Sequence, residues 1–216
     1  MVRSFRDEHP GRAAVESLVD LASWAPSAGK VQGWHAIALD GDRLGDFWRV
    51  CLPLERRDAF AWPGLLRAPV VLILLAEPDA YVRRYAEPDK RATGLGEGRD
   101  RWTVPYWLVD ASFAAMVAML GAVDAGLGTL FFAVADEAAV RREFDVPDDF
   151  DIVGALAIGM ADGDRRPGRS ARRPRRQPSD IIHWGSWTTP SNATRSDERN
   201  SSTVEDGARH SRSRHT

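Results

Sequence analysis

The sequence predicts a protein of alternating helices and strands, built as one domain with a polar C-terminal tail. Apolar patterns of helical and of strand spacing alternate along residues 11–159. The 216 residues, 44% of them hydrophobic, suffice for one large core but not for two. From residue 188 onward only Ala193, Val204 and Ala208 are aliphatic. We therefore expect a domain over residues 1–187 and a disordered tail over residues 188–216.

The first half of the domain is predicted to contain two helices and two strands. A helix is expected from about residue 11 to Trp24, where Pro26 ends it. Residues 34–39 alternate between two faces and stop at a turn, which is typical of a strand. Residues 42–52 favour a second helix with Asp42 as its N-cap. The continuous apolar run over residues 69–76 indicates a strand buried on both faces.

The second half begins with a polar, glycine-rich stretch over residues 87–104. It could be a lid over an anionic substrate or a nicotinamide nucleotide, or a mobile surface loop. The longest helix is expected over residues 105–125 and ends at Gly126-Leu127-Gly128. Residues 129–134 and 152–159 indicate two strands, separated by a short helix that Asp136 caps.

The long helix has one face made only of small residues, which permits close approach of another helix. A contact between subunits and a contact within the chain both remain open. Its other sides are also apolar, so we expect it to be central, and Asp110 and Asp124 argue against a membrane span. The small residues are Ala111, Ala114, Ala115, Ala118, Gly121, Ala122 and Ala125.

Composition argues against several classes of protein. The net charge of −2 does not favour nucleic-acid binding, and the arginine-rich run over residues 165–176 lacks interleaved aromatic residues. Cys51 is the only cysteine and is expected to be a buried structural thiol, so no disulfide within the chain is possible. The five histidines show no ligand spacing, and we expect no metal. A charged N-terminus and the lack of a clear membrane span predict a cytoplasmic protein without a membrane or nucleic-acid partner.

The stretch from Trp24 to His35 joins the first helix to the first strand through small residues. Such a loop lets the backbone approach a flat ligand closely. It follows a helix C-terminus, where the helix dipole disfavours an anion, so a phosphate would have to be held elsewhere. An ordinary connection between a helix and a strand is the alternative.

Two motifs stand near the ends of the domain. Arg3-Ser4-Phe5-Arg6 is followed by Trp24-Ala25-Pro26-Ser27-Ala28-Gly29, then Gln32 and Trp34. At the other end, basic residues precede Pro178-Ser179-Asp180-Ile181-Ile182-His183-Trp184. Both motifs resemble those of the nitroreductase family of FMN flavoproteins. Lys30 and Gly33 depart from the family's usual Asn and Pro, and the resemblance covers residues 1–187.

This resemblance implies an α+β fold with a mixed central sheet flanked by helices, assembled as an intertwined homodimer with two FMN sites at the interface. The FMN phosphate and ribityl chain would be held by one subunit, and the loop of the other subunit would meet the ring. His183 would be structural. The residues implied to bind the cofactor are Arg3, Ser4, Arg6, Phe132, Ala133, Arg173 and Arg175, with Pro26, Ser27, Ala28 and Lys30 on the loop.

The activity implied by the resemblance is that of an oxidoreductase. Hydride would pass from NADH or NADPH through flavin N5 to an electron-poor small molecule such as a nitroaromatic, a quinone or an activated alkene. No catalytic side chain is named, because the flavin carries this chemistry and the protein supplies position and electrostatics. Two alternatives remain: a flavoenzyme with another electron donor and a dedicated substrate, and a protein that binds flavin or another nucleotide without turnover.

Overall fold

The computed structural model describes residues 1–163 and 168–187. The chain forms two compact units, Met1–Arg166 and Pro167–Thr216, and each is described by itself. The predicted disordered tail, residues 188–216, lies outside the described residues.

The first unit is built on a four-stranded sheet with the order β1-β2-β4-β3. Its strands are β1 (Trp34–Leu39), β2 (Val70–Ala76), β3 (Gly128–Phe132) and β4 (Asp151–Gly159). All of them lie within two residues of their predicted bounds. The three pairings are antiparallel, so these strands do not form the mixed sheet that was expected. A parallel neighbour would have to come from outside these four strands.

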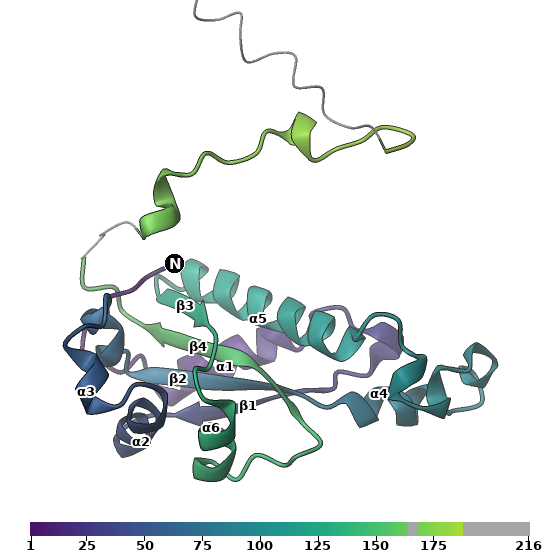
Figure 1. Cartoon of the computed structure of the whole chain (residues 1–216), viewed down its shortest axis with the longest axis horizontal. Helices are drawn as coiled ribbons and strands as arrows, with labels where there is room; N and C mark the ends of the chain where they lie inside the picture. Colours follow the sequence, from purple (N-terminus) through teal and green to yellow (C-terminus); the bar gives the residue numbers. More distant parts are fainter. Residues whose placement is uncertain (164–167, 188–216) are drawn as a thin grey trace, which may run out of the picture. The chain divides into compact units, whose positions relative to one another are not determined.

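Helices cover both faces of the sheet (Figure 1). One face carries α1 (Arg12–Ala22) and α5 (Tyr106–Asp124). The other carries α2 (Asp42–Cys51) and α6 (Glu137–Glu143), with α3 (Leu54–Arg57) nearby. In β2, Leu72 packs toward α1 and α5, whereas Val71 and Ile73 pack toward α2. This alternation buries β2 on both faces, as its apolar run predicted.

The small-residue face of α5 packs within its own chain. Ala114, Ala118 and Ala122 are buried in one cluster with Leu18 of α1. A Cβ atom on Gly121 would lie 2.5 Å from Leu21 Cδ2, so α1 crosses α5 closely there. The hypothesis that this face joins two subunits is therefore wrong, and the contact lies within the chain. By length and composition alone α5 could cross a membrane, but its small face belongs to this core.

Two further segments differ from the prediction or add to it. The N-cap of α2 is Gly41, with φ of 52°, and Asp42 is the first helical residue. The long polar stretch contains three short 3-10 turns, η3 (Arg91–Thr93), η4 (Leu95–Glu97) and η5 (Arg99–Arg101). They follow α4 (Pro78–Tyr85), to which Arg99 is tied by an ion pair of 2.6 Å with Asp79. Close packing against the end of α4 explains why this stretch is regular. A Cβ atom on Gly96 would lie 2.3 Å from the backbone nitrogen of Ala86.

The described part of the second unit contains two short 3-10 turns, η6 (Arg169–Arg172) and η7 (Pro178–Asp180). Gln177 and Asp180 form a reciprocal capping box around η7. The ring of His183 stacks on Trp187 at a centroid distance of 4.2 Å. The predicted structural role of His183 is compatible with this contact and stays a prediction.

Candidate functional site

The N-terminal segment is fixed along the end of β4. Phe5 forms a β-bridge with Ala161, and the Arg6 amide donates to the Met160 carbonyl at 2.9 Å. Ser4 is buried, and its hydroxyl donates to a carboxylate oxygen of Asp162. The hydroxyl also accepts from Arg67 at 3.1 Å. The Ser4 side chain therefore points into the protein and is engaged there.

Arg67, which precedes β2 in the 3-10 turn η2 (Pro63–Arg67), was missed by the motif analysis. Its guanidinium pairs with Asp162 at 2.5 Å and donates to the Phe5 carbonyl at 3.0 Å. Arg67 thus ties η2 to the N-terminal segment, through Ser4 and Phe5, and to Asp162, which follows β4. No local pattern marks it, because its partners lie far away in the sequence.

Arg3 and Arg6 flank this anchored point. The Arg3 guanidinium lies over the ring of Trp62 at 4.9 Å, and Arg6 is exposed. Within residues 1–163 and 168–187, neither arginine forms an ion pair with a carboxylate. Both charges are therefore available to an anion.

A cavity of about 380 Å³ brings together three of the residues predicted to bind the cofactor, Arg3, Phe132 and Ala133. Its volume lies within the range of about 300–1,000 Å³ that is common for small-molecule sites. The indole ring of Trp48 stacks on Phe132, with 5.8 Å between centroids and 11° between planes. The other lining residues are Cys51, Leu52, Phe60, Trp62, Leu65, Leu130 and Ala135.

Two side chains of this cavity have notable chemistry. The indole nitrogen of Trp48 is buried and has no hydrogen-bond partner in the part of the chain that the structure describes. An acceptor atom on a bound ligand would satisfy this donor. Burial raises the pKa of the Cys51 thiol to about 11, so the thiol is protonated at neutral pH. This agrees with a structural cysteine and not with a nucleophile.

The loop after α1 adopts a tightly specified backbone. Gly29, Lys30 and Gln32 have φ angles of 62°, 56° and 54°, in the left-handed region that costs free energy for side chains other than glycine. The hydroxyl of Ser27 accepts a hydrogen bond from the backbone N–H of Gln32 at 3.1 Å, and the side-chain amide of Gln32 donates to the Ser23 carbonyl at 2.7 Å. Gln32, a residue of the motif, thus holds the loop closed by hydrogen bonds to Ser23 and Ser27.

The loop lies beside α4 and the long polar stretch. Arg84 of α4 donates to the Gly29 carbonyl at 3.1 Å. Ala28 lines a cavity of about 520 Å³, together with the last residue of α4 and residues that follow this helix. Lys30 and Pro26 are exposed, and Ser27 and Ala28 are half-buried. The other residues that line this cavity are Tyr85, Leu95, Arg101, Trp102, Thr103, Val104 and Tyr106.

The predicted site residues therefore fall into separate groups. Arg3 contacts the segment between α3 and β2, whereas the loop contacts α4, and α3 and α4 lie at opposite ends of the sheet (Figure 1). The cavity at Arg3 is not lined by any of the four predicted loop residues, and the cavity at Ala28 is not lined by Arg3, Phe132 or Ala133. Arg173 and Arg175 are exposed residues of the second unit, and their assignment to the phosphate stays a prediction.

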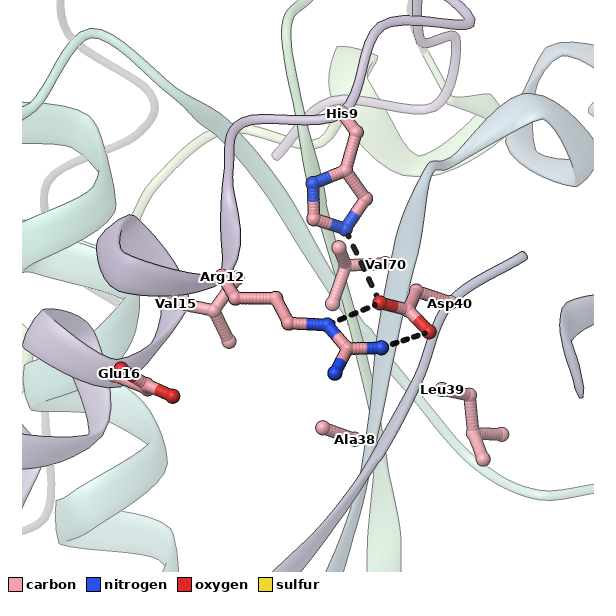
Figure 2. A pocket seen from close by; sticks show the side chains of 8 residues that line it. All are labelled: His9, Arg12, Val15, Glu16, Ala38, Leu39, Asp40 and Val70. Carbon is pink, nitrogen blue, oxygen red and sulfur yellow. Dashed lines mark hydrogen bonds and ion pairs between the residues drawn. The ribbon is translucent and has the colours of Figure 1, made fainter.

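A third cavity, of about 240 Å³, lies between α1 and the end of β1 (Figure 2). The Asp40 carboxylate accepts hydrogen bonds from Arg12 Nε at 3.1 Å and from Arg12 Nη2 at 3.4 Å, and His9 Nε2 lies 3.6 Å from the same carboxylate. None of the residues predicted to bind the cofactor lines this third cavity. The charged cluster ties the start of α1 to the end of β1. Among the described residues, no group of three potential metal ligands occurs.

The fold and the anchored N-terminal motif define a class of α+β proteins built on this sheet, and comparison with known proteins names it. The model of the nitroreductase family matches residues 1–160. The chain therefore belongs to the nitroreductase family, a family of flavin-dependent oxidoreductases.

Similar proteins of known structure share the fold. A nitroreductase-like protein from Streptococcus mutans has a TM-score of 0.66 at 18% identity, over 84% of this chain and 92% of that one. An FMN-dependent nitroreductase from Clostridium difficile has a TM-score of 0.59 at 18% identity, over 86% and 94% of the two chains.

A curated relative is more similar in sequence. The 5,6-dimethylbenzimidazole synthase of Rhodospirillum rubrum is 31% identical over 172 residues, which is 73% of this chain and 76% of the relative. The synthase of Rhodobacter capsulatus is 27% identical over 161 residues, or 74% and 78%.

Proposed function

We propose that the protein is an FMN-dependent oxidoreductase that uses NADH or NADPH to reduce an electron-poor small molecule. Family membership supports the flavin, and the meeting of Arg3, Phe132 and Ala133 at one cavity is the observation that carries the assignment to this site. Bound FMN supplies hydride transfer at its N5 atom. The chain's own residues bind and orient the cofactor.

The residues of the cavity suit such a cofactor. Arg3 lines the cavity and provides a cation for a phosphate, and the aromatic side chains provide flat walls for a ring. Arg6 does not line the cavity; it is an exposed second cation on the same segment. The indole N–H of Trp48 offers a donor that now lacks an acceptor among the described residues. Ser4 does not suit a phosphate contact in this conformation, because Asp162 and Arg67 occupy its hydroxyl. We assign Ser4 to holding the segment that carries the two arginines.

The separation of the two groups of predicted residues favours a site shared by two chains. A cofactor that contacts the cavity at Arg3 and also a loop such as Pro26–Lys30 needs that loop from a second copy. The outer face of α5 is a suitable contact surface, because it leaves four apolar side chains exposed along one helix. Phe113, Met116, Leu120 and Val123 are 47%, 53%, 62% and 65% exposed. We therefore propose a homodimer that meets along this face.

A second candidate function is favoured by the curated relatives, which are named for the synthesis of 5,6-dimethylbenzimidazole. That compound and the flavin ring both contain a dimethylated benzene ring with two adjacent nitrogen substituents. The discriminating assay therefore supplies reduced FMN under air and looks for 5,6-dimethylbenzimidazole by chromatography and mass spectrometry. Its appearance, without steady turnover of NADH or NADPH with added acceptors, would replace the first proposal.

Arg3 and Arg6, which we propose to bind the phosphate of FMN, provide the direct test of the cofactor site. Loss of one partner from a partly buried charge pair costs about 2–5 kcal/mol, and an exposed charge contributes about 0–1. At about 1.4 kcal/mol per tenfold, Arg3→Ala or Arg6→Ala should weaken FMN binding by about thirtyfold or more. Riboflavin lacks the phosphate and should bind the variants nearly as well as the wild type.

Fluorescence titration of the apo-protein with both flavins measures this difference. Arg56→Ala, a change to an exposed arginine in α3, is the matched control and should leave both affinities unchanged. Equal losses for FMN and riboflavin would assign Arg3 and Arg6 to the fold and not to the phosphate. Wild-type protein that binds neither flavin would refute the proposed function.

A further inference from the structure

Asp110 is a buried acidic residue in the otherwise apolar helix α5, with only 3% of its surface exposed. One of its carboxylate oxygens, Oδ2, accepts two hydrogen bonds of 2.8 Å each. The first comes from the backbone N–H of Ala28 in the loop after α1, and the second from the hydroxyl of Tyr81 in α4. Burying a carboxyl group is costly unless such donors compensate it. Asp110 therefore links the loop to two helices.

The Tyr81 side chain is held so that its hydroxyl has one direction. It is fully buried, and its ring meets Trp102 at 5.8 Å and Trp107 at 6.2 Å between centroids. Burial, and then the hydrogen bond to Asp110, raise the pKa of Tyr81 far above its ordinary value. The hydroxyl therefore keeps its proton and remains a donor to the carboxylate.

Gly33 makes room for this tyrosine. A Cβ atom at position 33 would lie 2.8 Å from Cε2 of the Tyr81 ring and 3.2 Å from the Ala80 side chain. A proline at this position would bring its whole ring into that space. The glycine in the loop motif is thus coupled to Tyr81, because the aromatic ring passes where a side chain at position 33 would stand.

We propose that Asp110 is a positioning residue for the cofactor loop, acting through the Ala28 amide with Tyr81 as its second donor and Gly33 as the residue that admits Tyr81. The inference rests on the proposed function, in which this loop meets the flavin ring. Gly29 and Lys30, the two residues after Ala28, have left-handed φ angles. A fixed amide immediately before them restrains the loop in that conformation. Without the Asp110 contact the loop should sample other conformations, and both flavins should lose the ring contact equally.

The test compares Asp110→Ala and Tyr81→Phe with the wild type. Asp124→Ala is the matched control, since Asp124 is exposed in the same helix. Two quantities are measured: the affinity of the apo-protein for FMN and for riboflavin, and amide hydrogen exchange by mass spectrometry over residues 24–34. Tyr81→Phe removes one donor and keeps the ring, so it serves if Asp110→Ala does not fold.

Asp110→Ala should weaken the binding of FMN and of riboflavin by the same factor, about tenfold or more, because a hydrogen bond to a charged group is lost. Tyr81→Phe should weaken both by a smaller common factor. Exchange should accelerate over residues 24–34 and stay unchanged in the sheet, while Asp124→Ala should match the wild type. This pattern differs from that of Arg3→Ala, which should affect FMN alone.

Faster exchange throughout the sheet together with that in the loop would make Asp110 a residue of general stability and overturn the inference. Unchanged flavin affinity in a variant whose loop exchanges faster would overturn it as well. Failure of the proposed function has another signature: wild-type protein would bind neither flavin, although the loop exchanged slowly.

Discussion

The outer face of α5 offers a test of the proposed dimer through Leu120→Asp. Leu120 is 62% exposed, and full burial of a leucine side chain contributes about 1.5–3 kcal/mol. Covering the exposed part at an interface should therefore contribute about 1–2 kcal/mol per subunit. In a twofold interface each substitution acts twice, giving about 2–4 kcal/mol. The dimer dissociation constant should rise by about 30-fold to about 1,000-fold, and by more if the new carboxylate is buried.

Sedimentation over a range of protein concentrations measures this change. Leu54→Asp is the matched control, because Leu54 is a 73% exposed leucine in α3, away from α5. The control should leave the dissociation constant unchanged, and circular dichroism should show that both variants fold. A wild type that is monomeric at micromolar concentration would refute the proposed contact, as would a dimer that Leu120→Asp does not weaken.

Two further predictions follow from packing and from charge. Ala118→Leu places a larger side chain between α5 and α1, so it should cost about 1–3 kcal/mol of unfolding free energy in chemical denaturation; an unchanged midpoint would contradict the packing described for this face. Burial opposes the charge of Glu77, but hydrogen bonds from Arg83 and His35 outweigh it and lower the Glu77 pKa below its ordinary 4.5. A lowered folded-state pKa stabilises the protein above that value, and the stabilisation is lost as the pH falls through the folded-state pKa. The melting temperatures of wild type and Glu77→Gln should therefore differ at pH 7 and converge as the pH falls below 4.5 and through the folded-state pKa, and a gap that is constant with pH would contradict this cause.

The order and bounds of the main elements could be predicted from the sequence, because each depends on local periodicity and on its end signals. β2 is a clear case, since a seven-residue apolar strand is stable only with both faces covered. The side of α5 that faces its own chain could not be predicted. A helix that is apolar nearly all round can bury either side. The side of α5 with small residues lets another helix approach more closely, and α1 packs against that side.

The site divides in the same way. Short motifs in the sequence predicted a flavin cofactor through their resemblance to the nitroreductase family, and the prediction of the family is confirmed by the family match. Only the tertiary structure showed that Ser4 faces inward to Asp162 and Arg67, and that Asp110 reaches the loop through Ala28. These contacts join residues 63 to 158 positions apart. Local sequence patterns carry no information about such distances, because it is the folding of the sheet and its helices that brings the partners together.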